Sequence, residues 1–136
     1  MSVTRSTPAG LMAPTPYHHV AVATGGRQVF VAGQIARTAD GEPLAPGDLA
    51  GQVAAALRNT AVALHGVGAD FVDVVRLTFY VTDWSPGKIT DFMLGVEKVA
   101  EEIGLPTPLP PASLIGVAFL WQPDVLVEVE ATAVLD

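Results

Sequence analysis

The last segment of the chain, from Pro110 onward, alternates between two faces so regularly that it constrains the fold more than any other stretch. Between residues 125 and 134, one face is apolar at period two and consists of Val125, Val127, Val129, Ala131 and Ala133. The opposite face holds Leu126, Glu128, Glu130, Thr132 and Val134. This pattern predicts a half-buried strand, and residues 112–120 predict a second strand facing it. The two carboxylates either lie in water, or they need partners for their charge if their face is covered.

The first third of the chain predicts two more strands, over residues 17–23 and 28–35. The Gly25-Gly26 pair between them can adopt the positive φ angles of a tight hairpin. Gly33, inside the second strand, indicates either a bulge or a close approach to the backbone. We expect residues 1–16, which contain three prolines, to form an extended arm. Residues 36–47 predict a loop with room for one short strand.

Two helices are predicted around one further strand, residues 71–82. Apolar residues recur at helical spacing after Asp48, a suitable N-cap, until Gly66. Ser85-Pro86 predicts the start of a second helix that ends at Gly104. The order is then β-β-(β)-α-β-α-β-β, which predicts a single α+β domain over residues 1–136, with two helices on one face of a mixed sheet.

The composition favours an oligomer that binds neither nucleic acid nor membrane. Half of the chain is hydrophobic and only 15% is charged, and the other sheet face has no helix to cover it, so a second copy of the chain is expected there. The formal net charge of −7 opposes binding to phosphate backbones. No apolar run is long enough to span a membrane, and the first ten residues lack the apolar segment of a signal peptide, so we expect a cytoplasmic protein. Arg76 is the single cation of the 71–82 strand, and we expect it to pair with an acid across an interface.

Several motifs together resemble the Rid/YjgF family of reactive-intermediate deaminases over residues 16–134. They are Pro16-Tyr17, the segment from Val29 to Gln34, Gln52 and Asn59, the segment from Val74 to Asp83, Pro111-Ala112, and the segment from Glu128 to Ala133. The resemblance implies a chorismate-mutase-like fold and a homotrimer with clefts between subunits. It also implies hydrolysis of enamines and imines to oxo acids and ammonia without a cofactor.

The resemblance also assigns candidate site residues. Tyr17 matches the cleft tyrosine, Gly33 the glycine that lines the pocket, and Glu128 the carboxylate that positions water, so Glu128 and Tyr17 are the candidate catalytic residues. Ser113 stands where the family's substrate-binding arginine is expected. The family's cleft asparagine and a frequent cysteine correspond to Val96 and Ile115.

Without the arginine, the family's usual grip on a substrate carboxylate is missing, because serine offers one neutral donor in place of a guanidinium fork. Ser113, Leu114, Ile115 and Val96 suit a less polar or larger ligand, so we expect a substrate range shifted away from small amino-acid-derived imines. The alternative is a non-catalytic trimer that binds a small apolar metabolite.

Other candidate residues keep structural alternatives. Glu128 can form a salt bridge at a subunit interface, and Tyr17 can fill an interface with its ring. His18 and His19 point to opposite faces of their strand, so one of them, His19 in our assignment, faces the cleft. No spacing places two histidines on one face, so no metal site is expected.

Overall fold

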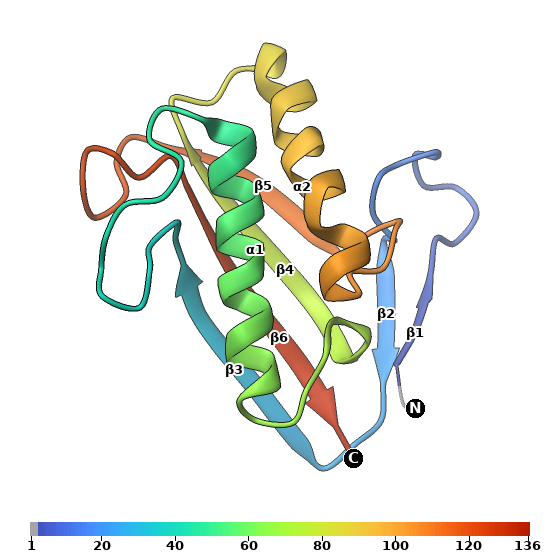
Figure 1. Cartoon of the computed structure of the whole chain (residues 1–136). Coiled ribbons are helices and arrows are strands. Elements are labelled where there is room, and N and C mark those ends of the chain that lie inside the picture. Colours follow the sequence, from blue (N-terminus) through green and yellow to red (C-terminus); the bar gives the residue numbers. More distant parts are fainter. Residues whose placement is uncertain (1–2) are drawn as a thin grey trace.

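Four strands form the main sheet of the computed structural model, which describes residues 3–136, and two helices cover one of its faces (Figure 1). The strands are β1 (Val3–Ser6), β2 (Val20–Ala23), β3 (Arg27–Gln34), β4 (Val74–Thr82), β5 (Ala112–Val117) and β6 (Val127–Leu135). The α-helices are α1 (Leu49–His65) and α2 (Ile89–Ile103), and the short 3-10 helices are η1 (Phe71–Asp73) and η2 (Pro86–Lys88). The sheet order is β3-β6-β4-β5, with β6 antiparallel to both neighbours and β4 parallel to β5. The predicted α+β fold with a mixed sheet is therefore confirmed.

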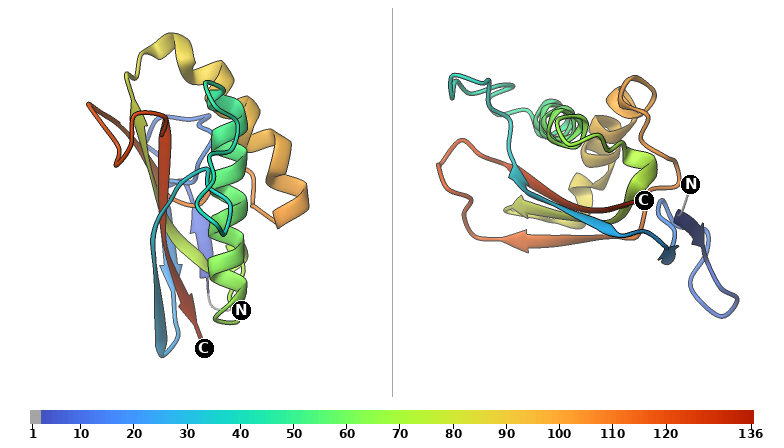
Figure 2. Two further views of the ribbon diagram at one scale, coloured as in Figure 1. Left: turned by 60° about the vertical axis from the view of Figure 1, so that its left-hand side comes forward. Right: turned by 90° about the horizontal axis from the view of Figure 1, so that it is seen from below.

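The core lies between the sheet and the helices, as the alternation in β6 predicts. Val127, Val129 and Ala133 are buried there, and the alternate residues of β4, Leu77 and Phe79 among them, face the same way. Figure 2 shows both helices on one side of the sheet. Among the described residues, neither helix is long and apolar enough to cross a membrane.

Both predicted boundaries of α1 and the predicted end of α2 are confirmed, whereas α2 begins at Ile89, three residues later than Ser85-Pro86 predicted. The Asp48 carboxylate accepts a hydrogen bond from the Gly51 amide at 3.0 Å, which satisfies one free donor of the first turn. Gly104 ends α2 in the left-handed conformation, at φ 68°, that glycine adopts without steric cost. Ser85 and Pro86 begin η2, which leads directly into α2.

Two predicted strand pairings are wrong. The strands over residues 112–120 and 125–134 do not face each other, because β4 lies between β5 and β6. β5 instead pairs in parallel with β4, since α2 and the following turn return the chain to the same end of the sheet. Residues 17–23 and 28–35 form no hairpin either: β2 pairs with β1 in a separate ribbon, and β3 joins β6.

The ribbon of β1 and β2 also corrects the expectation for residues 1–16, since residues 3–6 form a strand. Arg5 attaches this ribbon to the start of β4. Its guanidinium donates to the backbone carbonyls of Phe71 at 3.1 Å and of Val72 and Val74 at 2.8 Å each. Burial lowers the pKa of Arg5. The ribbon therefore has a fixed attachment to the main sheet.

The face of the main sheet opposite the helices, called the open face below, carries polar and apolar side chains in turn. Its exposed or half-buried residues include Phe30, Arg76, Tyr80, Ser113, Ile115, Glu128 and Glu130. Phe30 is 73% exposed and Ile115 is 45% exposed. The open face thus exposes one large apolar side chain at each edge strand, Phe30 on β3 and Ile115 on β5.

Candidate functional site

Gly33 and Glu128 form the first part of the candidate site, on the neighbouring strands β3 and β6. The register of these strands shifts between Val31 and Gln34, so Gly33 lies at a bulge or irregularity, one of the two alternatives that the sequence left open. A side chain at position 33 would collide with the Glu128 carboxylate. Glycine at this position permits the close approach and leaves the carboxylate lying over the backbone of β3.

A shallow hollow adjoins Gly33 on the side of α1. Its volume is about 440 Å³, and its lining includes Gln34, Arg37, Asn59 and Val62. The Asn59 amide donates to the carbonyls of Ile35 at 2.8 Å and Arg37 at 2.9 Å, which fixes the chain leaving β3. This end of the site therefore has a rigid backbone.

The second carboxylate of the alternating strand has a definite partner. The Tyr80 hydroxyl donates to Glu130 Oε1 at 2.6 Å, while Glu128 on β6 is directly opposite Tyr80 on β4. The hydrogen bond to Glu130 and, to a smaller extent, burial raise the pKa of Tyr80. The sequence allowed the carboxylates of this strand either to lie in water or to have partners, and Glu130 has a partner.

Tyr17, Ser113 and Leu114 form the second part of the candidate site, at the edge strand β5. They line a small, largely apolar cavity of about 110 Å³ between β5 and α2, together with Pro16, Phe79, Ile89, Phe92, Met93, Leu109 and Ala112. Tyr17 bridges to Leu109, and its ring lies 5.1 Å from that of His19 between centroids. The structure thus places Tyr17 beside Ser113, two residues that are far apart in sequence.

Val96 and Ile115 are not gathered at either part, whereas the His19 ring lies beside that of Tyr17. Val96 is completely buried in the core between α2 and the sheet, so it has no surface to offer a ligand and is removed from the site. Ile115 points to the open face, away from the cavity that Leu114 lines. The His19 ring lies 2.9 Å from the Met12 carbonyl through Nε2, which ties it to the loop before β2.

Sequence reasoning missed one contact at this site. The guanidinium of Arg76, on β4, donates to Ser113 Oγ at 2.5 Å. Arg76 was expected to pair with an acid across an interface, and the parallel pairing of β4 with β5 that brings it to Ser113 was not predicted. The one sequence feature that pointed to Arg76 as part of the open face is the alternation of β4, which places Arg76 and Tyr80 on the same face.

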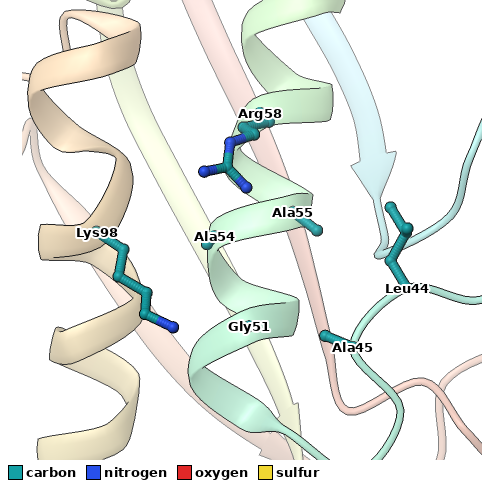
Figure 3. A pocket seen from close by; sticks show the side chains of 7 residues that line it. All are labelled: Leu44, Ala45, Gly51, Ala54, Ala55, Arg58 and Lys98. Carbon is teal, nitrogen blue, oxygen red and sulfur yellow. The ribbon is translucent and has the colours of Figure 1, made fainter.

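A further hollow of about 470 Å³ lies on the helix side, between α1, α2 and the loop before α1 (Figure 3). Alanines line it, with Arg58 and Lys98 at its rim. Arg58 is engaged by Glu102 through two hydrogen bonds of 2.9 and 3.2 Å. None of the predicted site residues lines this hollow. Across residues 3–136, no group of three or more histidine, aspartate or glutamate side chains is placed to hold a metal ion.

Comparisons with known proteins agree with this architecture. The sequence profile described as endoribonuclease L-PSP matches residues 7–135. YyfB of Yersinia pestis, a protein of the conserved Rid family, is 33% identical, with 99% of this chain and 100% of that chain covered and a TM-score of 0.86. The YjgF gene product of E. coli is 28% identical, with 98% and 96% covered and a TM-score of 0.68. E. coli TdcF, solved with bound serine, is 26% identical, with 97% and 94% covered and a TM-score of 0.69.

No curated protein matches the chain. The profile nevertheless spans nearly all of the chain, and YyfB is similar to the chain in sequence and in fold over its whole length. The chain therefore belongs to the endoribonuclease L-PSP family, also known as the YjgF/Rid family.

Proposed function

We propose that this protein hydrolyses a reactive imine or enamine, or a related unstable small molecule, in a cleft between two copies of the chain. The observation that carries the proposal is the Glu128 carboxylate held over Gly33, where a side chain would exclude it. A carboxylate so placed can orient a water molecule and accept its proton. Water adds to the carbon of the C=N bond, and the resulting carbinolamine loses ammonia to leave a carbonyl group. Tyr17 is the proposed donor of a proton to the leaving nitrogen.

The arrangement of the strands supports a cleft between copies. Gly33 lies on one edge strand of the main sheet, β3, and Ser113 lies on the other, β5. Three strand spacings separate these edges, which is about 14 Å. A small ligand cannot touch both parts within one chain, whereas the β3 edge of one copy beside the β5 edge of the next unites them. Such a head-to-tail contact closes into a ring, and we propose a homotrimer.

The substrate range is the second part of the proposal. The bound serine in TdcF supports a small organic molecule as the ligand of this chain. At position 113, however, this chain offers a neutral hydroxyl, and Leu114 and Ile115 beside it are apolar. We therefore propose that small amino-acid-derived imines are poor substrates and that larger or less polar molecules are preferred.

A non-catalytic binding function is the second candidate. The apolar lining of the 110 Å³ cavity favours it, because such a cavity can hold an alkyl group without chemistry. The family's description as an endoribonuclease has less support in this chain. Its net charge of −7 opposes contact with phosphates, so we expect no RNA binding that weakens with added salt.

The test measures imine lifetime. An amino-acid oxidase generates imines from amino acids of increasing size, and semicarbazide traps whatever remains. We expect the wild-type protein to shorten the lifetime of larger imines, and Glu128→Gln to abolish this effect. Glu97→Gln, at an exposed position of α2, is the matched control and should keep full activity. Equal activity of wild type and Glu128→Gln would refute the hydrolytic proposal and favour the binding function.

A further inference from the structure

Arg76 makes fewer side-chain hydrogen bonds than Arg5, Arg37 or Arg58, and Arg27 donates to the Asp136 backbone oxygen at 2.9 Å. Arg37 and Arg58 each grip a carboxylate through two nitrogens, and Arg5 donates to three carbonyls. Among residues 3–136, Arg76 makes one side-chain hydrogen bond, to the neutral Ser113 hydroxyl, and no ion pair. A guanidinium has five N–H donors, so most of those of Arg76 remain available.

The surroundings of Arg76 keep these donors free for an anion. Arg76 is exposed on the open face, and Thr132 lies directly across on β6. The nearest carboxylate along β6 in that direction, Glu130, already accepts the hydrogen bond of Tyr80. The direct neighbours of Arg76, Thr132 and Ser113, carry neutral hydroxyl groups, and no ion pair joins Arg76 to Glu130. Ser113 accepts from Arg76 through its oxygen, so its own hydroxyl proton can be donated outward.

We propose that Arg76 and Ser113 together bind the carboxylate of the substrate, an inference that rests on the proposed function and gives its substrate class. A guanidinium and a hydroxyl side by side match the two oxygens of a planar carboxylate. Ser113 also belongs to the lining of the apolar cavity at the edge strand β5, and Leu114 faces the other side of the sheet, so the alkyl group of a bound acid reaches this cavity around the β5 edge. The ligand is then an acid with an apolar portion, rather than a neutral molecule.

The position of the cation also bears on ligand length. Because Arg76 is rooted in β4, it starts one strand spacing, about 4.8 Å, further from the β5 edge than a cation at position 113 would. If the carboxylate is bonded directly to the reacting carbon, binding of the carboxylate by Arg76 moves the reacting carbon away from the β5 edge and on to the open face. An acid whose carboxylate is separated from that carbon by several bonds can reach Arg76 and still leave the reacting carbon at the edge. This reach accounts for the proposed shift away from small amino-acid-derived imines.

The experiment is a calorimetric titration with stable carbonyl compounds, so that binding is measured apart from turnover. The probes are 4-oxopentanoate, its uncharged amide, and the isomer 2-oxopentanoate. We expect wild type to bind 4-oxopentanoate about ten-fold more tightly than the amide, as for a hydrogen-bonded charge, and more tightly than the isomer. Arg76→Gln should lose the preference for the acid over the amide, and Arg76→Lys should keep part of it. Arg58→Gln, whose parent residue pairs with Glu102 on the helix side, is the control and should keep all of it.

Each other result has a definite meaning. The inference is overturned if Arg76→Gln still prefers the acid over the amide. If this variant also loses its oligomers, Arg76 instead pairs with an acidic residue of a second copy of the chain. Tighter binding of 2-oxopentanoate overturns the inferred length. If Arg76→Gln does not fold, Ser113→Ala replaces it and should weaken binding of the acid but not of the amide. Acid binding that depends on Arg76 without any imine hydrolysis would refute the proposed function alone.

Discussion

Glu128 and Gly33 face each other across β6 and β3 so closely that the glutamate carboxylate occupies the space of a side chain at position 33. The first prediction follows from this contact. Gly33→Ala should displace the carboxylate, lower the free energy of unfolding by about 1–3 kcal/mol as overpacking does, and reduce imine hydrolysis roughly a hundred-fold through misplacement. Thermal unfolding and the trapping assay measure the two effects. Gly26→Ala is the matched control, because no atom lies within 4 Å of the added carbon. An active Gly33→Ala variant would remove Glu128 from the mechanism.

A second prediction concerns assembly. Phe30 is 73% exposed on the open face, and its burial in a second copy would stabilise the oligomer by about 1.5–3 kcal/mol. We expect wild type to sediment at three times the mass of one chain, and Phe30→Glu to dissociate it at micromolar concentration. Leu94→Glu, at a 48% exposed position of α2, should leave the trimer intact. A wild-type monomer would contradict the proposed cleft.

The third prediction is the titration of Tyr80. Its pKa lies above the model-compound value of 10.0 because the hydroxyl donates to Glu130. The folded state thus keeps a proton that the unfolded state releases. The resulting stabilisation is present below pH 10 and is lost as the pH rises through the folded-state pKa. In Tyr17→Phe, phenolate absorbance reports Tyr80 alone, and its midpoint should lie above 10. Adding Glu130→Gln should lower that midpoint.

A fourth prediction concerns the loop between β5 and β6. Arg37 binds the Asp124 carboxylate through two hydrogen bonds of 2.5 and 2.9 Å, and these hydrogen bonds lower the pKa of Asp124. A lowered pKa stabilises the folded state above the unfolded-state value of about 3.8, and this contribution is lost as the pH falls through the folded-state pKa. Asp124→Asn should therefore reduce Tm at pH 7, and the difference from wild type should vanish in strong acid. A difference that persists in strong acid would assign the effect to packing rather than charge.

The sequence predicts local features of this fold well and strand partners poorly. The period-two pattern of β6 and the caps at Asp48 and Gly104 depend on neighbouring residues, and the structure confirms them. Which strands pair depends on contacts between distant segments, so β4 was not expected to separate β5 from β6. Such pairings depend on how distant segments pack together, which local residue patterns in a single sequence do not show.

The same division holds within the candidate site. The sequence left two alternatives open at Gly33, a bulge or a close approach to the backbone, and the structure shows both, because the strand register shifts there and the Glu128 carboxylate lies against the glycine. The contact from Arg76 to Ser113 depends on the parallel pairing of β4 with β5 and could not be predicted without it. The family resemblance assigned Val96 to the cleft, whereas the apolar stripe of α2 predicts a core residue. The structure agrees with the stripe, since Val96 is buried in the core.

The attachment of Arg5 has a consequence at a distance from its own contacts. Residues 7–19 leave β1 and return to β2, and Tyr17 lies near the end of this excursion. The ribbon therefore holds both ends of the segment that carries the tyrosine, and Arg5 holds the ribbon. An alteration at the beginning of the chain, such as a truncation or a fused peptide, would displace Tyr17 without touching the other residues of the cavity it lines.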